Sequence, residues 1–348
     1  MSLKSRKHCI SVILIGFFLL ILQKSEAQQD FSSLDAFFKK YQKDLGGDAV
    51  SIIMKNGKVL YQKEVGEFNV KTQAPIASCS KWLTAAMVMT LVDEGKIHLD
   101  DPVANYIPIF NKYMKSYVTI RHCLTHTTGI ERESKLIKKI VERSNYQNLE
   151  EEVNAIAAKE ISNNPGVEFF YGGVGLNIAA RVCEIVTKKS FDRLVQEKIL
   201  RPLKMRSTNF TNDNGGAPNP SGGAKSTALD YMNFLQMLLN KGTFEGKKVL
   251  SPESVEMMLK VQTAGFPVKY APPAAGNALY GFGAWILDQD ENGNGIVVAC
   301  PGLFGTWPYI DRKRNYAAIV FVKNLQASQR RQIMDDFQSR VEGILDSQ

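Results

Sequence analysis

Hydrophobic and polar residues follow a helical period at the start of the chain and a strand period near its end. Apolar residues at helical spacing from Phe31 to Leu45 predict an amphipathic helix that ends at Gly46-Gly47. Asn56-Gly57 lies between two β-rich runs, which predicts a hairpin with strands over 49–54 and 59–62. From residue 279 onward the period is two, and we predict strands over 279–287, 295–299 and 317–322, then a closing helix over 329–345.

The middle of the chain carries mostly helical patterns. Residues 82–92 are apolar on almost every side, so we expect this helix to lie inside the molecule. Further helices are predicted over 149–161, 174–188 and 228–241, and a short one over 119–129 that a glycine ends. Two segments rich in Gly and Pro, 207–223 and 265–278, predict long loops at the rim of a binding site.

Strands at both ends with helices between them predict one sheet built from distant parts of the chain. The expected fold class is α/β in the broad α+β sense: a mixed antiparallel sheet flanked by helices, with an inserted all-helical lobe. We expect one catalytic unit over 28–348, in which 28–76 and about 280–348 form the sheet lobe. Residues from about 77 to 279 form the helical lobe and its loops.

The first residues predict an export signal. Lys4, Arg6 and Lys7 precede the apolar run from Val12 to Leu22, and Ser25-Glu26-Ala27 offers small residues for cleavage. The apolar run is shorter than the roughly 20 residues that span a bilayer. We therefore predict a signal peptide over 1–27, a secreted or periplasmic protein, and no stable membrane span after cleavage.

Composition excludes several classes of protein. The net charge is +8 over 348 residues, and no Lys/Arg block with interleaved aromatic residues supports nucleic-acid binding. The four cysteines after the predicted leader resemble neither a metal site nor a small disulfide framework, and we expect buried free thiols; they are Cys79, Cys123, Cys183 and Cys300. The run 288–293 imitates the start of a calcium loop, but the twelfth position is Ala299, so a hairpin turn is expected. No metal and no cofactor are predicted.

The clearest chemistry lies in Ser78-Cys79-Ser80-Lys81. A serine three residues before a lysine shares one face of a helix with it, one turn apart. Burial disfavours the charged form of the lysine, which lowers its pKa and lets it act as a base. The pair is therefore a candidate nucleophile with its proton acceptor.

A histidine-based triad is disfavoured. After the predicted leader the chain holds only His98, His122 and His126, and it lacks Gly-x-Ser-x-Gly. We expect His126 to fix a turn rather than to act as a base.

Several motifs in the same order resemble the serine β-lactamase and penicillin-binding-protein superfamily, in particular the class C-like serine hydrolases that include esterases and D-amino-acid peptidases. The resemblance runs from about Ala49 to Val322. It is strongest in four stretches: Ser78 to Lys81, Asp100 to Val103, Leu124 to Gly129, and Gly222 to Thr227 with Asp230.

The resemblance implies roles for three residues. Ser78 is similar to the acylated nucleophile, and Lys81 to its proton acceptor. Tyr171 stands where the family has the tyrosine of Tyr-x-Asn, which shares the proton transfers. Either positive charge on Lys81 favours a tyrosinate, or Lys81 is neutral and Tyr171 relays the proton; the sequence leaves both open.

The family's third motif, Lys-Thr-Gly or His-x-Gly, aligns with Cys300-Pro301-Gly302. The resemblance implies an oxyanion hole formed by the backbone N–H groups of Ser78 and Leu303, with Gly302 permitting close approach of the substrate. Two departures stand out: Cys300 replaces the cation or imidazole, and Gly173 replaces the Asn amide. We expect acyl-enzyme chemistry to survive without efficient antibiotic hydrolysis.

The favoured function is a secreted serine hydrolase that forms an acyl-enzyme on Ser78, of the esterase type, acting on small acyl or ester substrates. Within the same fold, the alternative is a D-aminopeptidase, a DD-peptidase or a weak β-lactamase acting on cell-wall-type amides. A non-catalytic binding protein on this scaffold is disfavoured because Ser78, Lys81 and Tyr171 are all present. The expected partner is a small ester or amide, and the oligomeric state is left open.

Overall fold

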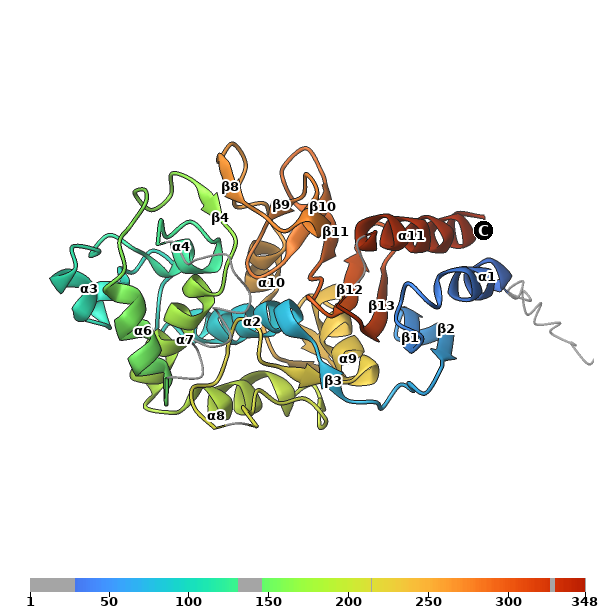
Figure 1. Ribbon diagram of the computed structural model, residues 1–348, viewed down its shortest axis with the longest axis horizontal. Coiled ribbons are helices and arrows are strands. Elements are labelled where there is room, and N and C mark those ends of the chain that lie inside the picture. The colour runs from blue at the N-terminus through green and yellow to red at the C-terminus, as the bar shows by residue number, and fades with distance from the viewer. Residues whose placement is uncertain (1–28, 131–145, 214, 326–328, 348) are drawn as a thin grey trace, which may run out of the picture. The chain divides into compact units, whose positions relative to one another are not determined.

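An antiparallel sheet brings the two ends of the described chain together (Figure 1). The computed structural model describes residues 29–130, 146–213, 215–325 and 329–347, so the predicted leader lies outside the described residues. Within these ranges the sheet has seven strands, in the order β2 (Lys58–Val65), β1 (Ala49–Lys55), β13 (Tyr316–Lys323), β12 (Gly305–Asp311), β11 (Gly295–Ala299), β10 (Trp285–Gln289) and β9 (Leu279–Tyr280). Ala49 lies opposite Val322, which fixes the register between the first and last long strands.

Helices cover both faces of this sheet. Side chains from α1 (Ser32–Tyr41) and α11 (Arg330–Asp346) pack on one face, where Phe37 and Phe337 meet with ring centroids 5.3 Å apart. Alternate residues of β1, such as Ile52, face the larger core on the other side, together with α9 (Ala228–Leu239). The period of two in β1 therefore divides its side chains between two cores.

A buried helix, α2 (Ser80–Asp93), forms the centre of the larger core, and every side chain from Ser80 to Leu91 is buried. The prediction of an internal helix is thus confirmed. The remaining helices among the described residues are α3 (Ile109–Lys112), α4 (Ile120–Leu124), α6 (Leu149–Ala157), α7 (Val174–Thr187), α8 (Phe191–Val195) with a π-helical turn Gln196–Leu200, and α10 (Pro252–Met258). Short 3₁₀ turns are Ala77–Cys79, Val103–Asn105 and Pro273–Ala275.

The fold class predicted from the sequence is confirmed, and the inserted part also contains small strand pairs. These pairs are β3 (Ala74–Pro75) with β5 (Lys225–Ser226), β4 (Phe169–Phe170) with β8 (Val268–Tyr270), and β6 (Thr243–Phe244) with β7 (Lys247–Lys248). The boundary between a sheet lobe and a helical lobe stays a prediction. No helix among the described residues combines the length and the apolar character needed to cross a membrane.

Several elements differ from the sequence prediction: the helix expected over 149–161 ends at Ala157, and the one expected over 119–129 spans only Ile120–Leu124. The first helix ends at Tyr41 rather than Leu45. The strand expected over 279–287 is interrupted at 281–284, and β12 was not predicted at all. All seven residues of β12 are buried, so the strand shows no alternation of polar and apolar residues.

Candidate active site

Ser78 lies in a tight turn that leads into α2. The turn is the 3₁₀ segment Ala77–Cys79, and Ala77 has a positive φ of 44°. Ser80 holds the turn, because its hydroxyl donates to the Ala77 carbonyl at 2.6 Å and accepts from the Ala224 N–H at 3.0 Å. A residue held in this sparsely populated conformation is typical of functional turns.

Lys81 lies beside Ser78, as the three-residue spacing predicts. Its Nζ donates to Ser78 Oγ at 3.0 Å and to the Ser221 carbonyl at 2.7 Å. Only 4% of Lys81 is exposed. The side chain is therefore held between the serine hydroxyl and a backbone carbonyl, away from bulk water.

Tyr171 joins this pair from another part of the chain. It lies between β4 and α7, and Lys81 Nζ is 4.9 Å from the centroid of its ring. Burial and the neighbouring Cys300 raise the pKa of the Tyr171 hydroxyl well above its ordinary value, although a hydrogen bond with the Ser78 side chain opposes this shift. The hydroxyl is therefore protonated at neutral pH.

His126 packs against the ring of Tyr171. Its backbone has φ of 59°, its ring lies 4.7 Å from the Tyr171 ring, and its carbonyl accepts from the Phe170 N–H. Burial and the nearby charge of Lys81 hold the pKa of His126 well below its usual range, so the ring is neutral. These contacts agree with the expected turn-fixing role.

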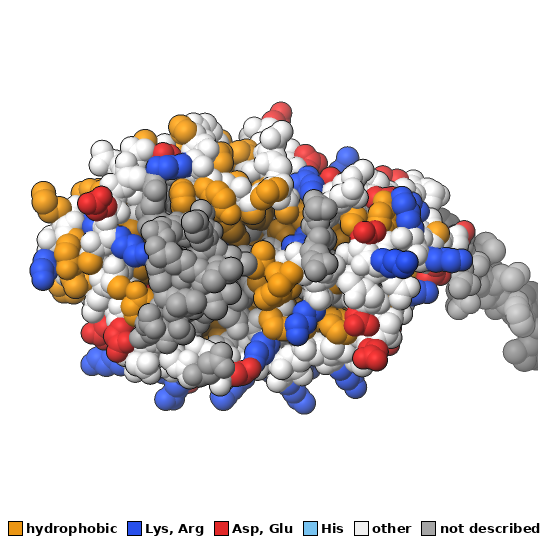
Figure 2. Space-filling view, in the orientation of Figure 1, with side chains coloured by type: hydrophobic (Ala, Val, Ile, Leu, Met, Phe, Trp, Pro, Cys, Tyr) orange, Lys and Arg blue, Asp and Glu red, His pale blue; other side chains and the backbone are white. Residues whose placement is uncertain are grey.

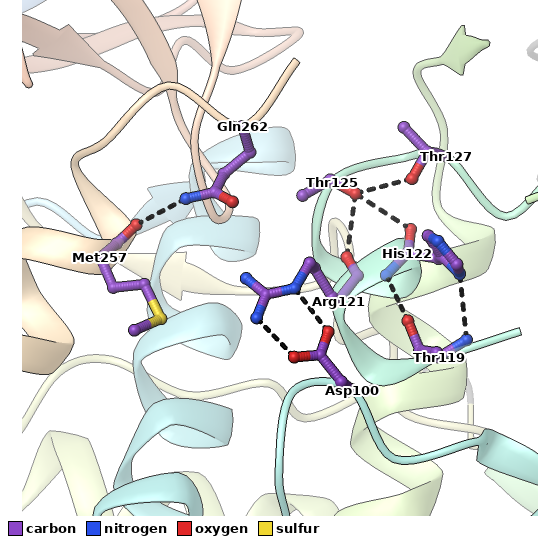
Figure 3. Close-up of polar contacts among 8 residues, drawn as sticks. All are labelled: Asp100, Thr119, Arg121, His122, Thr125, Thr127, Met257 and Gln262. Carbon is purple, nitrogen blue, oxygen red and sulfur yellow. Dashed lines mark hydrogen bonds and ion pairs between the residues drawn. The ribbon is translucent and has the colours of Figure 1, made fainter. Parts of the chain in front are cut away.

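Polar contacts fix the segment around α4, which precedes His126 in the chain; Figure 3 shows those of Asp100, Thr119, Arg121 and His122. Thr119 caps the helix by accepting from the His122 N–H, while the His122 ring accepts from the Thr119 N–H. Arg121 forms a bidentate pair with Asp100. A Cβ on Gly175 in α7 would lie 2.0 Å from the Cys123 carbonyl, so α4 and α7 pack at backbone contact. The family motifs around Asp100 and His126 thus act structurally here.

The end of β11 closes the opposite side of the site. Cys300 Sγ lies within hydrogen-bond distance of the Ser78 carbonyl, at 3.3 Å, and of the Gly283 carbonyl, at 3.2 Å, and its single S–H can donate to either. Burial raises the pKa of this thiol to about 12, with the Lys81 charge opposing. The four cysteines among the described residues are free and buried, as expected.

Two backbone N–H groups, one in the Ser78 turn and one after Gly302, have no acceptor among the described residues. Within the described part of the chain, neither the Ser78 N–H nor the Leu303 N–H has a hydrogen-bond partner. Arg330, at the start of α11, fixes the turn that carries Leu303 by donating to the Leu303 carbonyl at 2.8 Å and to the Gly302 carbonyl at 3.2 Å. Two unpaired donors on a fixed backbone have the composition of an oxyanion hole.

Gly302 is required for close contact between this turn and the Ser78 turn. A Cβ at residue 302 would lie 2.3 Å from the Ile76 carbonyl oxygen and 3.1 Å from Cys79 Sγ. We expect Gly302→Ala to cost about 1–3 kcal/mol of stability through overpacking. Gly343→Ala is the matched control, because nothing lies within 4 Å of that position in α11. Thermal unfolding of both variants checks this, and equal melting temperatures would contradict it.

The sequence analysis did not predict the residues that hold Lys81 on the side of Ser221. Ser221 supplies the carbonyl that holds Lys81, and its N–H donates to Asn177 Oδ1 at 3.2 Å. Asn177 in turn donates to the buried carboxylate of Glu152 at 3.0 Å. A Cβ on Gly173 would lie 2.5 Å from Ser221 Oγ, so this hydroxyl fills the space beside residue 173. No spacing rule connects residues 152, 177 and 221 in the sequence.

Within the described ranges, no group of three or more His, Cys, Asp or Glu side chains is arranged to hold a metal ion. The convergent groups are instead a hydroxyl, an amine, a phenol and backbone amides. Such a set can transfer an acyl group through a serine ester.

Comparisons with known proteins cover most of the chain. The beta-lactamase family model matches residues 34–341. Protein Rv1367c of Mycobacterium tuberculosis is 27% identical over an alignment of 267 positions that covers 60% of this chain and 66% of that protein. The chain thus spans just under two thirds of this curated relative.

Solved structures share the fold. A Bacteroides dorei protein described provisionally as a beta-lactamase is 28% identical with a TM-score of 0.81, covering 91% of this chain and 99% of its own. EstCE1, a hydrolase with promiscuous acyltransferase activity, is 18% identical with a TM-score of 0.70, covering 88% and 97%. At this lower identity the likeness shows the fold alone.

Proposed function

Because the chain belongs to the beta-lactamase family, whose members are serine hydrolases, we propose that it forms an acyl-enzyme on Ser78 and hydrolyses small esters. The observation that carries the proposal is the 3.0 Å contact between Lys81 Nζ and Ser78 Oγ, in a buried site that also holds Tyr171. The predicted leader adds that the protein acts after export, in the periplasm or outside the cell.

The proton transfers follow from the protonation state of Tyr171. Because its pKa is raised, Tyr171 is a neutral hydroxyl group, which favours the second of the two routes that the sequence leaves open. This route requires Lys81, whose positive charge lowers the pKa of His126, to lose its proton before Ser78 attacks. Ser78 Oγ attacks the substrate carbonyl carbon while its proton passes to Lys81. Tyr171 then helps to pass this proton to the departing alcohol. In the second stage water attacks the acyl-enzyme, the same groups transfer the protons in the reverse order, and the acid leaves with Ser78 restored.

The negative charge that develops on the substrate carbonyl oxygen needs donors. We assign this role to the unpaired N–H groups of Ser78 and Leu303. The Arg330 contacts with the 302–303 carbonyls hold one of these donors in place.

The surroundings of the site favour apolar, uncharged substrates. Cys300 occupies the place of a cation, and burial keeps its thiol protonated. Figure 2 shows hydrophobic side chains gathered over β4 and β8, the strands beside Tyr171. Exposed apolar residues here include Val268, at 64%, and Val167, at 46%, and Leu303 is 41% exposed. The neutral Cys300 thiol offers no positive charge to bind the carboxylate of a β-lactam. Esters with apolar groups are therefore the better fit.

A substrate panel tests the proposal. The mature protein should hydrolyse a short-chain aryl ester with an initial burst, because the acyl-enzyme accumulates before it is hydrolysed. Covalent penicillin adduct on intact mass, with turnover of D-amino-acid amides in place of esters, would establish the peptidase alternative instead. Absence of both ester and amide turnover, with no covalent adduct, would support the non-catalytic alternative.

Tyr171→Phe should lower kcat for the ester about a hundredfold, because proton transfer by a positioned side chain contributes roughly 10²–10⁴. The variant keeps the ring contacts with His126 and Trp285. Tyr113→Phe, on a half-buried tyrosine after α3, is the matched control. The measurement is kcat for the ester in both variants. A Tyr171→Phe enzyme with the wild-type kcat would show that Tyr171 takes no part in the proton transfers.

A further inference from the structure

The side-chain amide nitrogen of Asn219 lies near the Ser78 turn without an acceptor among the described residues. Its Oδ1 accepts from Ser221 Oγ at 2.9 Å, and its backbone carbonyl accepts from the N–H groups of Gly222 and Gly223. Across the residues that the structure describes, Asn219 Nδ2 has no acceptor, and the side chain is only half-buried. The amide is thus fixed at its oxygen and offers two N–H donors on its other side.

Glycine at position 222 keeps the space next to these donors open. A Cβ on Gly222 would lie 3.3 Å from Asn219 Nδ2 and 4.0 Å from the carbonyl carbon of Ala77, the residue before Ser78. The place that a side chain would fill therefore lies between the amide and the nucleophile turn. A Cβ on Gly172, next to Tyr171, would also meet nothing within 4 Å.

The segment 219–221 is rigidly attached to the catalytic helices. Thr84, one turn after Lys81 in α2, donates to the Pro220 carbonyl at 2.7 Å. Lys81 donates to the Ser221 carbonyl, and Asn177 of α7 accepts from the Ser221 N–H. Because Ser221 is held at both its backbone groups, its hydroxyl fixes the Asn219 amide. A donor fixed before the substrate arrives loses little conformational entropy on binding.

We propose that Asn219 is a specificity residue that binds a neutral carbonyl acceptor on the acyl side of the substrate, next to the scissile bond. This inference rests on the proposed acyl-enzyme function of Ser78. Because Ser221 holds Oδ1, the Nδ2 amide group of Asn219 is the part directed toward a ligand, and it donates; Cys300 offers no charge to attract a carboxylate. The substrate class is therefore esters of N-acylated amino acids, in preference to plain alkanoate esters of the same length.

Two p-nitrophenyl esters of matched length test this: the N-acetylglycine ester and the pentanoate ester, each corrected for its uncatalysed rate. The readout is the ratio of their kcat/KM values. Asn219→Ala should lower this ratio about five- to tenfold, the value of one net hydrogen bond. Gly222→Ala should lower it too, because the added methyl group blocks the open side of the amide. Asn111→Ala, on an exposed residue of α3, should keep the wild-type ratio.

The outcomes separate this inference from the proposed function. A fluorophosphonate adduct on Ser78, located by mass spectrometry in the wild type and in each variant, reports the acyl-enzyme site and a folded protein. An unchanged ratio in Asn219→Ala, or equal loss on both esters, would overturn the role of Asn219 while the adduct on Ser78 stands. An adduct elsewhere would instead remove the proposed function.

Discussion

Ser78→Ala is expected to abolish ester hydrolysis, with a loss of at least about 10⁴-fold in kcat, because removal of a serine nucleophile leaves only binding and oxyanion stabilisation. The initial burst should disappear as well. Ser78 Oγ is the group that Lys81 Nζ contacts at 3.0 Å, and the turn that carries it is held by Ser80 rather than by Ser78. The substitution should therefore leave the fold intact. Burst kinetics and labelling by a fluorophosphonate probe measure the effect.

Ser80 provides the control for this experiment. It lies two residues away and is fully buried, and its hydroxyl is committed to the Ala77 carbonyl and the Ala224 N–H. Ser80→Ala should still form the adduct on Ser78, with lower thermal stability from the lost hydrogen bonds. Residual activity of Ser78→Ala within roughly tenfold of wild type would reject Ser78 as the nucleophile.

Lys81→Met is expected to lower the rate of Ser78 acylation about 10³-fold, within the range of general-base catalysis. Methionine keeps the volume and the unbranched shape of the lysine but cannot accept a proton. The measurement is the rate of burst formation with an aryl ester across pH. We expect the remaining rate to increase with hydroxide concentration, since no amine is left to take the proton.

Lys115→Met is a close match for this substitution. Lys115 is also 4% exposed, and burial lowers its pKa, but it lies between α3 and α4, where its Nζ contacts the Tyr113 carbonyl. This variant removes a buried lysine without touching Ser78 or Tyr171. If it lost as much acylation rate as Lys81→Met, the effect would come from burial of a lysine in general and not from the base.

Local patterns in the sequence were sufficient to place the longer helices, the hairpin and the Ser78–Lys81 pair. A three-residue spacing on a helix fixes which side chains meet, and the contact between Lys81 and Ser78 follows from it. The burial of α2 followed from its apolar composition on every side. Tyr171 and the turn at Gly302 came from the family resemblance, since no local period connects them with Ser78.

The sequence could not indicate the contacts made by backbone groups and distant polar side chains. Ser221 acts on Lys81 through a carbonyl, which every residue type has, so its identity carries no signal. Arg330 donates to the carbonyl of Leu303 from the first residue of α11. The sequence pattern of this helix predicts only that it packs on the sheet. The strand β12 was missed for a related reason, because burial on both faces removes the alternation by which strands are found.

The pairing of β1 with β13 joins segments that are made at the start and at the end of protein synthesis. Ser78 emerges early, but the turn that faces it is formed by residues 300–305, and Arg330 fixes that turn. The first long strand, residues 49–55, pairs with residues 316–323. Contacts of such long sequence separation form late and fold slowly. We therefore expect a chain that is still being made to carry Ser78 before residues 300–305 and Arg330 are available to pack beside it.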